Sequence, residues 1–268
     1  MNRIAATFER LKEQNRKALI PYITAGDSSP ELTVPLMHAM VEAGANIIEL
    51  GVPFSDPMAD GPVIQKAAER ALMHNVSLRD VFEMVKSFRK QDKSTPVVLM
   101  GYLNPIEAMG YAEFASAAAQ AGVDGVLTVD MPPEEGGECM PLLREQGIDP
   151  IFLIAPTSTE ARIASLTASA RGFIYYVALK GVTGAGNLDT GGVAKKLIDI
   201  RKVTDLPLGV GFGIKDAETA VAVGKEADAV IIGSAIVKKV EESAGNPALI
   251  TANIVAMLSS IRGALDTL

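Results

Sequence analysis

Eight short apolar runs alternate along this chain with longer, alanine-rich runs of helical character. Three of the helical runs end at a glycine (Gly44, Gly122 or Gly147), which is a common way to stop a helix. Strands that alternate with helices pair in a parallel sheet, and eight such units favour a closed barrel over an open doubly wound sheet. The expected strands cover residues 18–24, 47–50, 96–102, 123–129, 148–154, 173–177, 206–210 and 229–232.

No Gly/Ser-rich linker and no block of like charge interrupts this alternation. We therefore expect one domain over residues 1–268, a (β/α)8 TIM barrel, because barrels of ~250 residues are common. An extra helix is expected over residues 2–13, where the apolar residues share one face. A terminal helix over residues 247–265 also has one apolar face, which should pack against the barrel.

The charge and the rarest residue types exclude several classes of function. The net charge of −7 argues against nucleic acid as a partner, because phosphate backbones are bound by clustered Lys and Arg. His38 and His74 lie in helical stretches without ligand-like spacing, so we expect no metal site and no histidine-based triad. The single cysteine, Cys139, excludes an intramolecular disulfide and fits a reducing compartment.

The sequence also lacks the signals that direct a chain to a membrane. No apolar run reaches the ~18 residues that a membrane helix needs, and the first residues do not open a signal peptide. Together with the lone cysteine, this predicts a cytoplasmic protein that has no membrane partner.

The segment from Gly51 to Gln65 follows a strand that carries Glu49 near its end, and it contains two further acids, Asp56 and Asp60. Burying an ionised Glu without a partner is expensive, so we expect Glu49 to be ion-paired or exposed at the strand's last turn. Long loops are often functional, and the active sites of barrels lie at the C-terminal ends of strands. Glu49 and Asp60 are therefore candidates for an acid/base pair. The alternative is a structural loop held by its own Asx-turns.

Glycine-rich turns follow the last three expected strands, at residues 181–186, 211–213 and 233–234, and the last of them opens a short helix. Glycine lets backbone N–H groups approach an anion closely, and a helix N-terminus favours negative charge. Since this is the recurrent phosphate site of the fold, we expect phosphate binding here, although a single GxG turn is more often a plain tight turn than a ligand site. Residues 181–190 suit a lid that orders on binding, with a passive surface loop as the alternative.

Several stretches resemble the alpha subunit of tryptophan synthase, in the order of that family. They are PYITAGD, IELGVPFSDPMADGPVIQ, MGYLNPI, VDMPPEE, FLIAPTST, GVTG, GFGI and IGSAIV. The resemblance covers nearly the whole chain, and the segment from Glu49 to Gln65 is highly specific. It implies a lyase of tryptophan biosynthesis, without metal or organic cofactor. The family cleaves indole-3-glycerol phosphate to indole and glyceraldehyde 3-phosphate in a retro-aldol reaction.

The resemblance also implies roles for individual residues. Glu49 matches the family's general acid/base, and Asp60 matches the carboxylate that faces the indole N–H. The positions that match the family's substrate site are Tyr22, Leu127, Val129, Leu153, Tyr175, Thr183, Gly184, Phe212, Gly213, Gly233 and Ser234. For the apolar members of this set, packing of the barrel is an equally good explanation.

The resemblance further implies a protein partner, the pyridoxal-phosphate beta subunit, in an alpha2beta2 heterotetramer. Asp56, Pro57, Asn104 and Pro132 match loops at the barrel mouth that face this subunit. From the residues alone, these four are ordinary loop positions.

The chain departs from the family at two positions near the expected site. Tyr22 stands where phenylalanine is common, which adds a hydroxyl to an apolar wall, and Ala178 stands where serine is frequent. Two other functions stay open: a barrel isomerase or epimerase that acts on another phosphorylated sugar, and a non-catalytic subunit that stimulates the beta chain. The first leaves the loop from Pro53 to Asp60 without a role, and the presence of both Glu49 and Asp60 argues against the second.

Overall fold

The structure, a computed structural model, describes residues 2–178, 190–211 and 213–268. Within these ranges, nine strands form one sheet in the order β5-β4-β3-β2-β1-β9-β8-β7-β6, and every neighbouring pair is parallel. The strands are β1 (Ala18–Thr24), β2 (Ile48–Gly51), β3 (Val97–Gly101), β4 (Gly125–Thr128), β5 (Asp149–Pro150), β6 (Phe152–Ile154), β7 (Ile174–Val177), β8 (Leu208–Gly211) and β9 (Ala229–Ile232).

The sheet closes into a barrel through one broken strand. β5 pairs with β4 and β6 pairs with β7, and only Ile151 separates β5 from β6. Pro150 has no backbone N–H to donate, but Ile151 N–H still donates to the Val126 carbonyl at 2.9 Å, and the pairing with β7 begins at Phe152. The nine strands are thus the eight expected ones with the fifth split in two. The predicted (β/α)8 barrel is confirmed.

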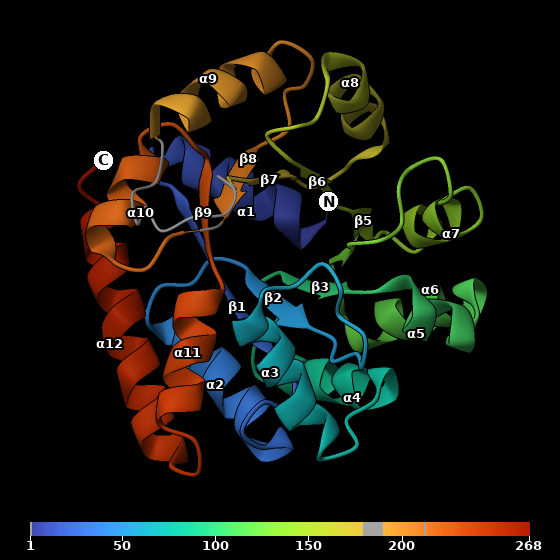
Figure 1. The fold of residues 1–268 in the computed structure, drawn as a ribbon, viewed down its shortest axis with the longest axis vertical. Coiled ribbons are helices and arrows are strands. Elements are labelled where there is room, and N and C mark those ends of the chain that lie inside the picture. The colour runs from blue at the N-terminus through green and yellow to red at the C-terminus, as the bar shows by residue number, and fades with distance from the viewer. Residues whose placement is uncertain (1, 179–189, 212) are drawn as a thin grey trace.

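Twelve helices lie in the described ranges, and they surround the strands (Figure 1). They are α1 (Arg3–Glu13), α2 (Pro30–Glu42), α3 (Pro62–Leu72), α4 (Leu78–Arg89), α5 (Leu103–Met109), α6 (Tyr111–Ala121), α7 (Cys139–Glu145), α8 (Glu160–Ser169), α9 (Thr190–Arg201), α10 (Ala217–Gly224), α11 (Ser234–Glu242) and α12 (Pro247–Leu265). The expected helices at both ends of the chain and after the last strand are all present. The larger of the apolar clusters fills the space between these helices and the strands.

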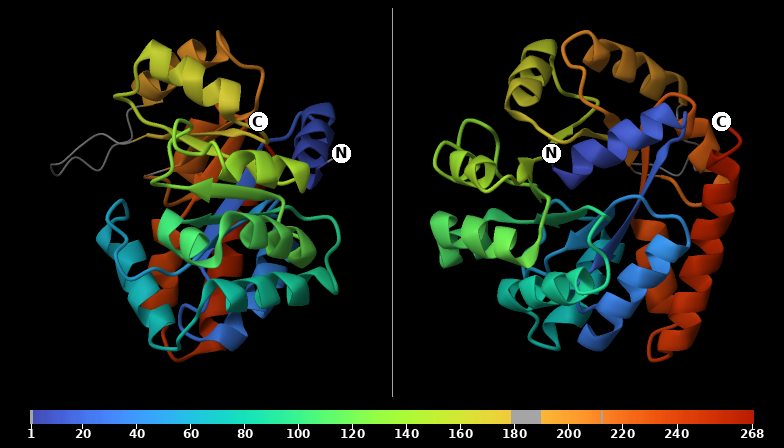
Figure 2. Two further views of the ribbon diagram at one scale, coloured as in Figure 1. Left: turned by 90° about the vertical axis from the view of Figure 1, so that its right-hand side faces the viewer. Right: turned by 180° about the vertical axis from the view of Figure 1, so that it is seen from behind.

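Helix α1 closes the N-terminal mouth of the barrel. Its buried residues Ile4, Phe8 and Leu11 belong to the same apolar cluster as inward-facing residues such as Ile47 and Phe173. The rings of Phe8 and Phe173 lie 5.8 Å apart between centroids. Seen from behind, α1 crosses the end of the barrel (Figure 2). Because this end is plugged, the barrel interior is open to a substrate only at the C-terminal ends of the strands.

A buried ion-pair network fastens α1 and α4 at the plugged end. Asp124, directly before β4, accepts hydrogen bonds from Arg3 Nη1 at 2.8 Å and from Arg89 Nη2 at 2.7 Å. The side chains of Asp124 and Arg89 are only 4% and 8% exposed. Since β4 starts at this end, the network lies at the opposite side of the barrel from the strand ends where the site is expected.

By length and composition alone, α12 could cross a membrane, contrary to the expectation that no segment reaches that length. It has 19 residues and a mean hydropathy of 1.5 over its best window. However, Ile250, Ile254, Leu258, Ile261 and Leu265 are all buried in the cluster between the helices and the strands. This periodic burial is typical of a helix that packs on a protein core.

Candidate active site

Glu49 lies on β2 and faces the barrel interior. In the parallel register it is level with Tyr22 on β1 and Val98 on β3. Glu49 is only 1% exposed, and its Oε1 has no hydrogen-bond partner among the described residues. Burial, and then the negative charge of Asp60, raise the pKa of Glu49 from 4.5 to about 8. The expectation of an ion-paired or exposed Glu49 is therefore wrong. It is a buried carboxyl that carries a proton at neutral pH.

Asp60 lies in the loop between β2 and α3, and Tyr102 holds its carboxylate. The Tyr102 hydroxyl donates to Asp60 Oδ2 at 3.0 Å and accepts a hydrogen bond from the backbone N–H of Ala59 at 3.0 Å. Gln65 Nε2 donates to the backbone carbonyl of Asp60 at 2.9 Å. Burial raises the pKa of Asp60, whereas the hydrogen bond from Tyr102 lowers it. Asp60 follows the C-terminal end of the strand that carries Glu49, so the two carboxyl groups belong to the same mouth of the barrel.

Tyr22 and Tyr175 lie beside Glu49 in the barrel interior. The hydroxyl of each lies so close to a backbone glycine that no larger residue fits there. A Cβ on Gly51 would lie 2.1 Å from the Tyr22 hydroxyl, and a Cβ on Gly211 would lie 2.3 Å from the Tyr175 hydroxyl. The Tyr22 hydroxyl is 3.1 Å from Thr24 Oγ1. Burial raises the pKa of both tyrosine hydroxyls, so both keep their protons and can donate hydrogen bonds.

Apolar side chains form the rest of the interior wall. Leu127 on β4 is 1% exposed and belongs to the inner cluster, and Val129, Leu153 and Met100 pack against it. These positions serve barrel packing, and the same surface suits a flat aromatic ring. The inner wall therefore combines one protonated carboxyl and two hydroxyls with an otherwise apolar lining.

The residues expected to bind an anion follow the ends of β8 and β9. Gly233 directly precedes α11, has no side-chain cap, and stands where a Cβ would be 3.7 Å from the Tyr22 Cβ. Ser234 is exposed at the first turn of α11, and Gly213 has a φ of +77° that favours glycine. The N-terminus of α11 thus follows the C-terminal end of β9, at the same mouth as Glu49, and its positive end favours an anion.

Three of the expected substrate-site residues lie outside the described residues: Thr183, Gly184 and Phe212. The same holds for the expected lid over residues 181–190, of which only the backbone of Thr190 is described, at the start of α9. Their predicted roles remain predictions.

The four residues expected to face a partner all lie in segments that follow strand ends at the site's mouth. Asp56 and Asn104 are exposed, while Pro57 and Pro132 are partly exposed. They follow the neighbouring strands β2, β3 and β4, so they lie along one side of the entrance to the barrel interior. Met58, beside Pro57, is 81% exposed, which is unusual for so large an apolar side chain.

Residues that the sequence analysis did not select also shape the site. Tyr102 is the partner of Asp60, and Thr24 is the partner of Tyr22. Both stand at or directly after the C-terminal end of a strand, where a polar residue indicates a possible role in the active site of a barrel. Among the described residues, no group of three or more His, Cys, Asp or Glu side chains is placed to hold a metal ion.

Comparison with known proteins identifies the family. A family model described as Tryptophan synthase alpha chain matches residues 8–264. The tryptophan synthase alpha chain of Thioalkalivibrio sulfidiphilus is 63% identical over 266 residues, which are 99% of this chain and 100% of that protein. The one from Methylococcus capsulatus is 59% identical over the same shares. The crystal structure of tryptophan synthase subunit alpha from Legionella pneumophila superimposes with a TM-score of 0.91 at 46% identity and covers both chains completely. The chain therefore belongs to the tryptophan synthase alpha chain family.

Proposed function

We propose that Glu49 and Asp60 are the catalytic residues of the alpha reaction of tryptophan synthase. In this reaction the chain, a lyase, cleaves indole-3-glycerol phosphate to indole and glyceraldehyde 3-phosphate. The observation that carries the proposed roles is the buried carboxyl of Glu49, whose Oε1 has no hydrogen-bond partner among the described residues and whose pKa is raised by the charge of Asp60. Membership of this family does not favour the alternatives of a sugar-phosphate isomerase or a non-catalytic stimulatory subunit.

Glu49 has the properties of a group that moves two protons in turn. The cleavage requires a proton at C3 of the indole and removal of the proton from the hydroxyl on the adjacent side-chain carbon. Protonated Glu49 donates to C3, and its carboxylate then accepts the hydroxyl proton while the carbon–carbon bond breaks and the aldehyde forms. Glu49 thus gives up one proton and takes up another, so it is protonated again at the end of the reaction. A pKa of about 8 suits both steps near neutral pH.

Asp60 stabilises the positive charge that protonation of C3 creates on the indole ring nitrogen. Its ionised carboxylate accepts the hydrogen bond of the ring N–H and stabilises the cationic intermediate. A preorganised group of this kind contributes about 3–4 kcal/mol to transition-state stabilisation. The hydrogen bond from Tyr102 supports the role, since it both fixes Oδ2 and lowers the pKa of Asp60.

The glycine corner is proposed to bind the phosphate group. Backbone N–H groups of Gly213, Gly233 and Ser234, together with the Ser234 hydroxyl, supply donors without a cationic side chain. The apolar wall around Leu127 and Tyr22 receives the indole ring. In this proposal the phosphate and the indole ring bind on opposite sides of Glu49.

The direct test is the release of indole from indole-3-glycerol phosphate by the purified protein and two variants. We expect Glu49→Gln and Asp60→Asn each to lower kcat by about 10²–10⁴-fold, because each removes one proton-transfer or charge-stabilising group. Glu83→Gln, on the exposed face of α4, is the matched control and should keep the wild-type rate. Undiminished turnover in Glu49→Gln would remove the assigned role.

The family implies a beta subunit as partner, and we further propose an alpha2beta2 heterotetramer in the cytoplasm. Support comes from the exposed Asp56 and Met58 beside Pro57, at the mouth through which indole must leave. Sedimentation with a tryptophan synthase beta subunit should give a species of two chains of each kind. Asp56→Ala should weaken this assembly and leave indole release by the isolated chain unchanged. A complex of another stoichiometry, or none, would contradict the proposal.

A further inference from the structure

A bidentate ion pair joins the segment after β1 to the last turn of α3. Arg70 donates to the Asp27 carboxylate through Nε at 2.6 Å and through Nη2 at 2.9 Å. The two side chains are 18% and 3% exposed, so the pair is largely shielded from water. A planar guanidinium that bonds both carboxylate oxygens fixes orientation as well as distance. Neither residue was selected in the sequence analysis, and neither is among the proposed catalytic residues.

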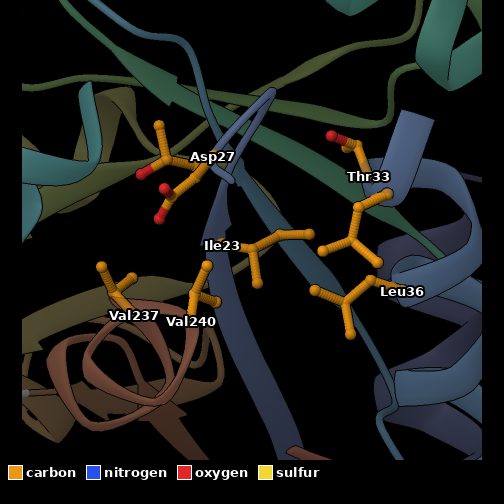
Figure 3. A pocket seen from close by; sticks show the side chains of 8 residues that line it. Ile23, Asp27, Thr33, Leu36, Val237 and Val240 are labelled. Atoms are coloured by element: carbon orange, nitrogen blue, oxygen red, sulfur yellow. The ribbon is translucent and has the colours of Figure 1, made fainter. Parts of the chain in front are cut away.

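Asp27 stands at a junction of three elements. Together with Ile23 it faces Val237 and Val240 of α11 across a small hollow, with α2 on the other side (Figure 3). Arg70 approaches α11 as well, since its Nη1 lies 3.5 Å from a carboxylate oxygen of Glu241. α3 and α11 lie side by side at the front of the barrel (Figure 1). The ion pair thus connects α3 to the C-terminal end of β1. Helix α11, whose N-terminus is proposed to bind the phosphate, packs beside this strand.

The position of α3 in turn determines the position of Asp60. The helix begins at Pro62, two residues after Asp60, and its Gln65 side chain donates to the Asp60 carbonyl at 2.9 Å. Ala67 of α3 belongs to the same small apolar cluster as Tyr22, which is paired with Glu49 in the sheet. Any shift of α3 along or away from β1 is therefore passed on to the Asp60 loop.

We propose that Arg70 is a positioning residue for the cleavage: through Asp27 it anchors α3 to the end of β1 and so sets where Asp60 stands relative to Glu49 and the phosphate corner. The inference rests on the proposed roles of the two carboxylates. It assigns Arg70 no contact with the substrate. A displacement of about 1 Å at a reacting group can cost on the order of 10²-fold in rate, so an anchor of this kind matters for turnover.

The test compares Arg70→Met, Arg70→Lys and Asp27→Asn with a control at the plugged end of the barrel. Asp124→Asn is the matched control, because it weakens a buried Arg–Asp network that does not contact α3. For each folded variant, kcat for indole release is measured, and the affinity for glycerol 3-phosphate, which carries only the phosphate end, is measured by calorimetry.

We expect Arg70→Met and Asp27→Asn to lower kcat by about 10- to 100-fold, while glycerol 3-phosphate binds within about twofold of wild type. Arg70→Lys keeps the positive charge but cannot form both hydrogen bonds to the Asp27 carboxylate in the same geometry. Its kcat should therefore lie between those of the wild type and Arg70→Met. Asp124→Asn should lower the thermal midpoint and keep the wild-type kcat. This split separates positioning from a general loss of structure, which would weaken binding and turnover together.

Wild-type kcat in folded Asp27→Asn and Arg70→Lys would overturn the proposal, and so would a parallel loss of phosphate affinity and kcat. If Arg70→Met does not fold, the kcat values of Arg70→Lys and Asp27→Asn test the proposal. Failure of the proposed function would look different, because Asp60→Asn would then retain full turnover. If Asp60→Asn is inactive while the Arg70 and Asp27 variants are fully active, the positioning role of Arg70 is rejected and the proposed function stands.

Discussion

The buried carboxyl of Glu49 makes a quantitative prediction about stability. Glu49 has a higher pKa in the folded chain than in the unfolded chain, so folding favours its protonated form. Its contribution to stability is therefore fully present below pH 4.5 and is lost progressively as the pH rises through about 8. Glu49→Gln replaces the carboxyl by an amide that does not titrate. The variant should gain stability over the wild type as the pH rises.

The size of this gain follows from the pKa change. A rise from 4.5 to about 8 corresponds to about 5 kcal/mol at full ionisation, as an order of magnitude. Between pH 5 and pH 9, the linkage relation gives a change of about 4 kcal/mol in the difference between variant and wild type. Groups that do not interact with Glu49 contribute equally to both proteins, so their contributions to the pH dependence cancel in the difference.

Urea unfolding of both proteins at pH 5, 7 and 9 is the assay. We expect the free energy of unfolding of Glu49→Gln, relative to wild type, to increase at each step, with most of the rise between pH 5 and pH 8. Glu83→Gln, at an exposed position, should show a flat difference. A flat difference for Glu49→Gln would refute the reasoning, because it would mean that Glu49 ionises as easily in the folded protein as in the unfolded chain.

Three further predictions concern other parts of the structure. Tyr102→Phe removes the hydrogen bond that lowers the pKa of Asp60, so the acidic limb of the kcat/KM profile for indole release should move to higher pH. Gly211→Ala places a Cβ against the Tyr175 hydroxyl and should cost about 1–3 kcal/mol in urea unfolding, together with a loss of kcat/KM. Asp124→Ala leaves a buried arginine without its partner and should cost about 3–5 kcal/mol in unfolding free energy, with kcat unchanged.

The architecture could be predicted because strand and helix patterns are local. Each expected strand is present, and the only break in the pattern, at Ile151, follows a proline that was visible in the sequence. The location of Glu49 and Asp60 at one mouth also followed, because the C-terminal ends of parallel strands share one side of the barrel.

The environment of the site was less predictable, because it depends on contacts between distant residues. Tyr102 and Asp60 are 42 positions apart, and Arg70 and Asp27 are 43 apart. No local pattern pairs such residues. The burial of Glu49 is unpredictable for another reason: a buried carboxyl oxygen without a partner among the described residues violates the general rule for polar groups, and exceptions of this kind concentrate at functional sites.

The most direct measurement is a crystal structure of the Glu49→Gln variant with indole-3-glycerol phosphate bound. The account predicts that the indole N–H lies within hydrogen-bonding distance of Asp60, that residue 49 faces C3, and that the phosphate lies against the backbone of Gly213, Gly233 and Ser234. A ligand whose ring points away from Asp60, or whose phosphate binds elsewhere on the chain, would contradict it.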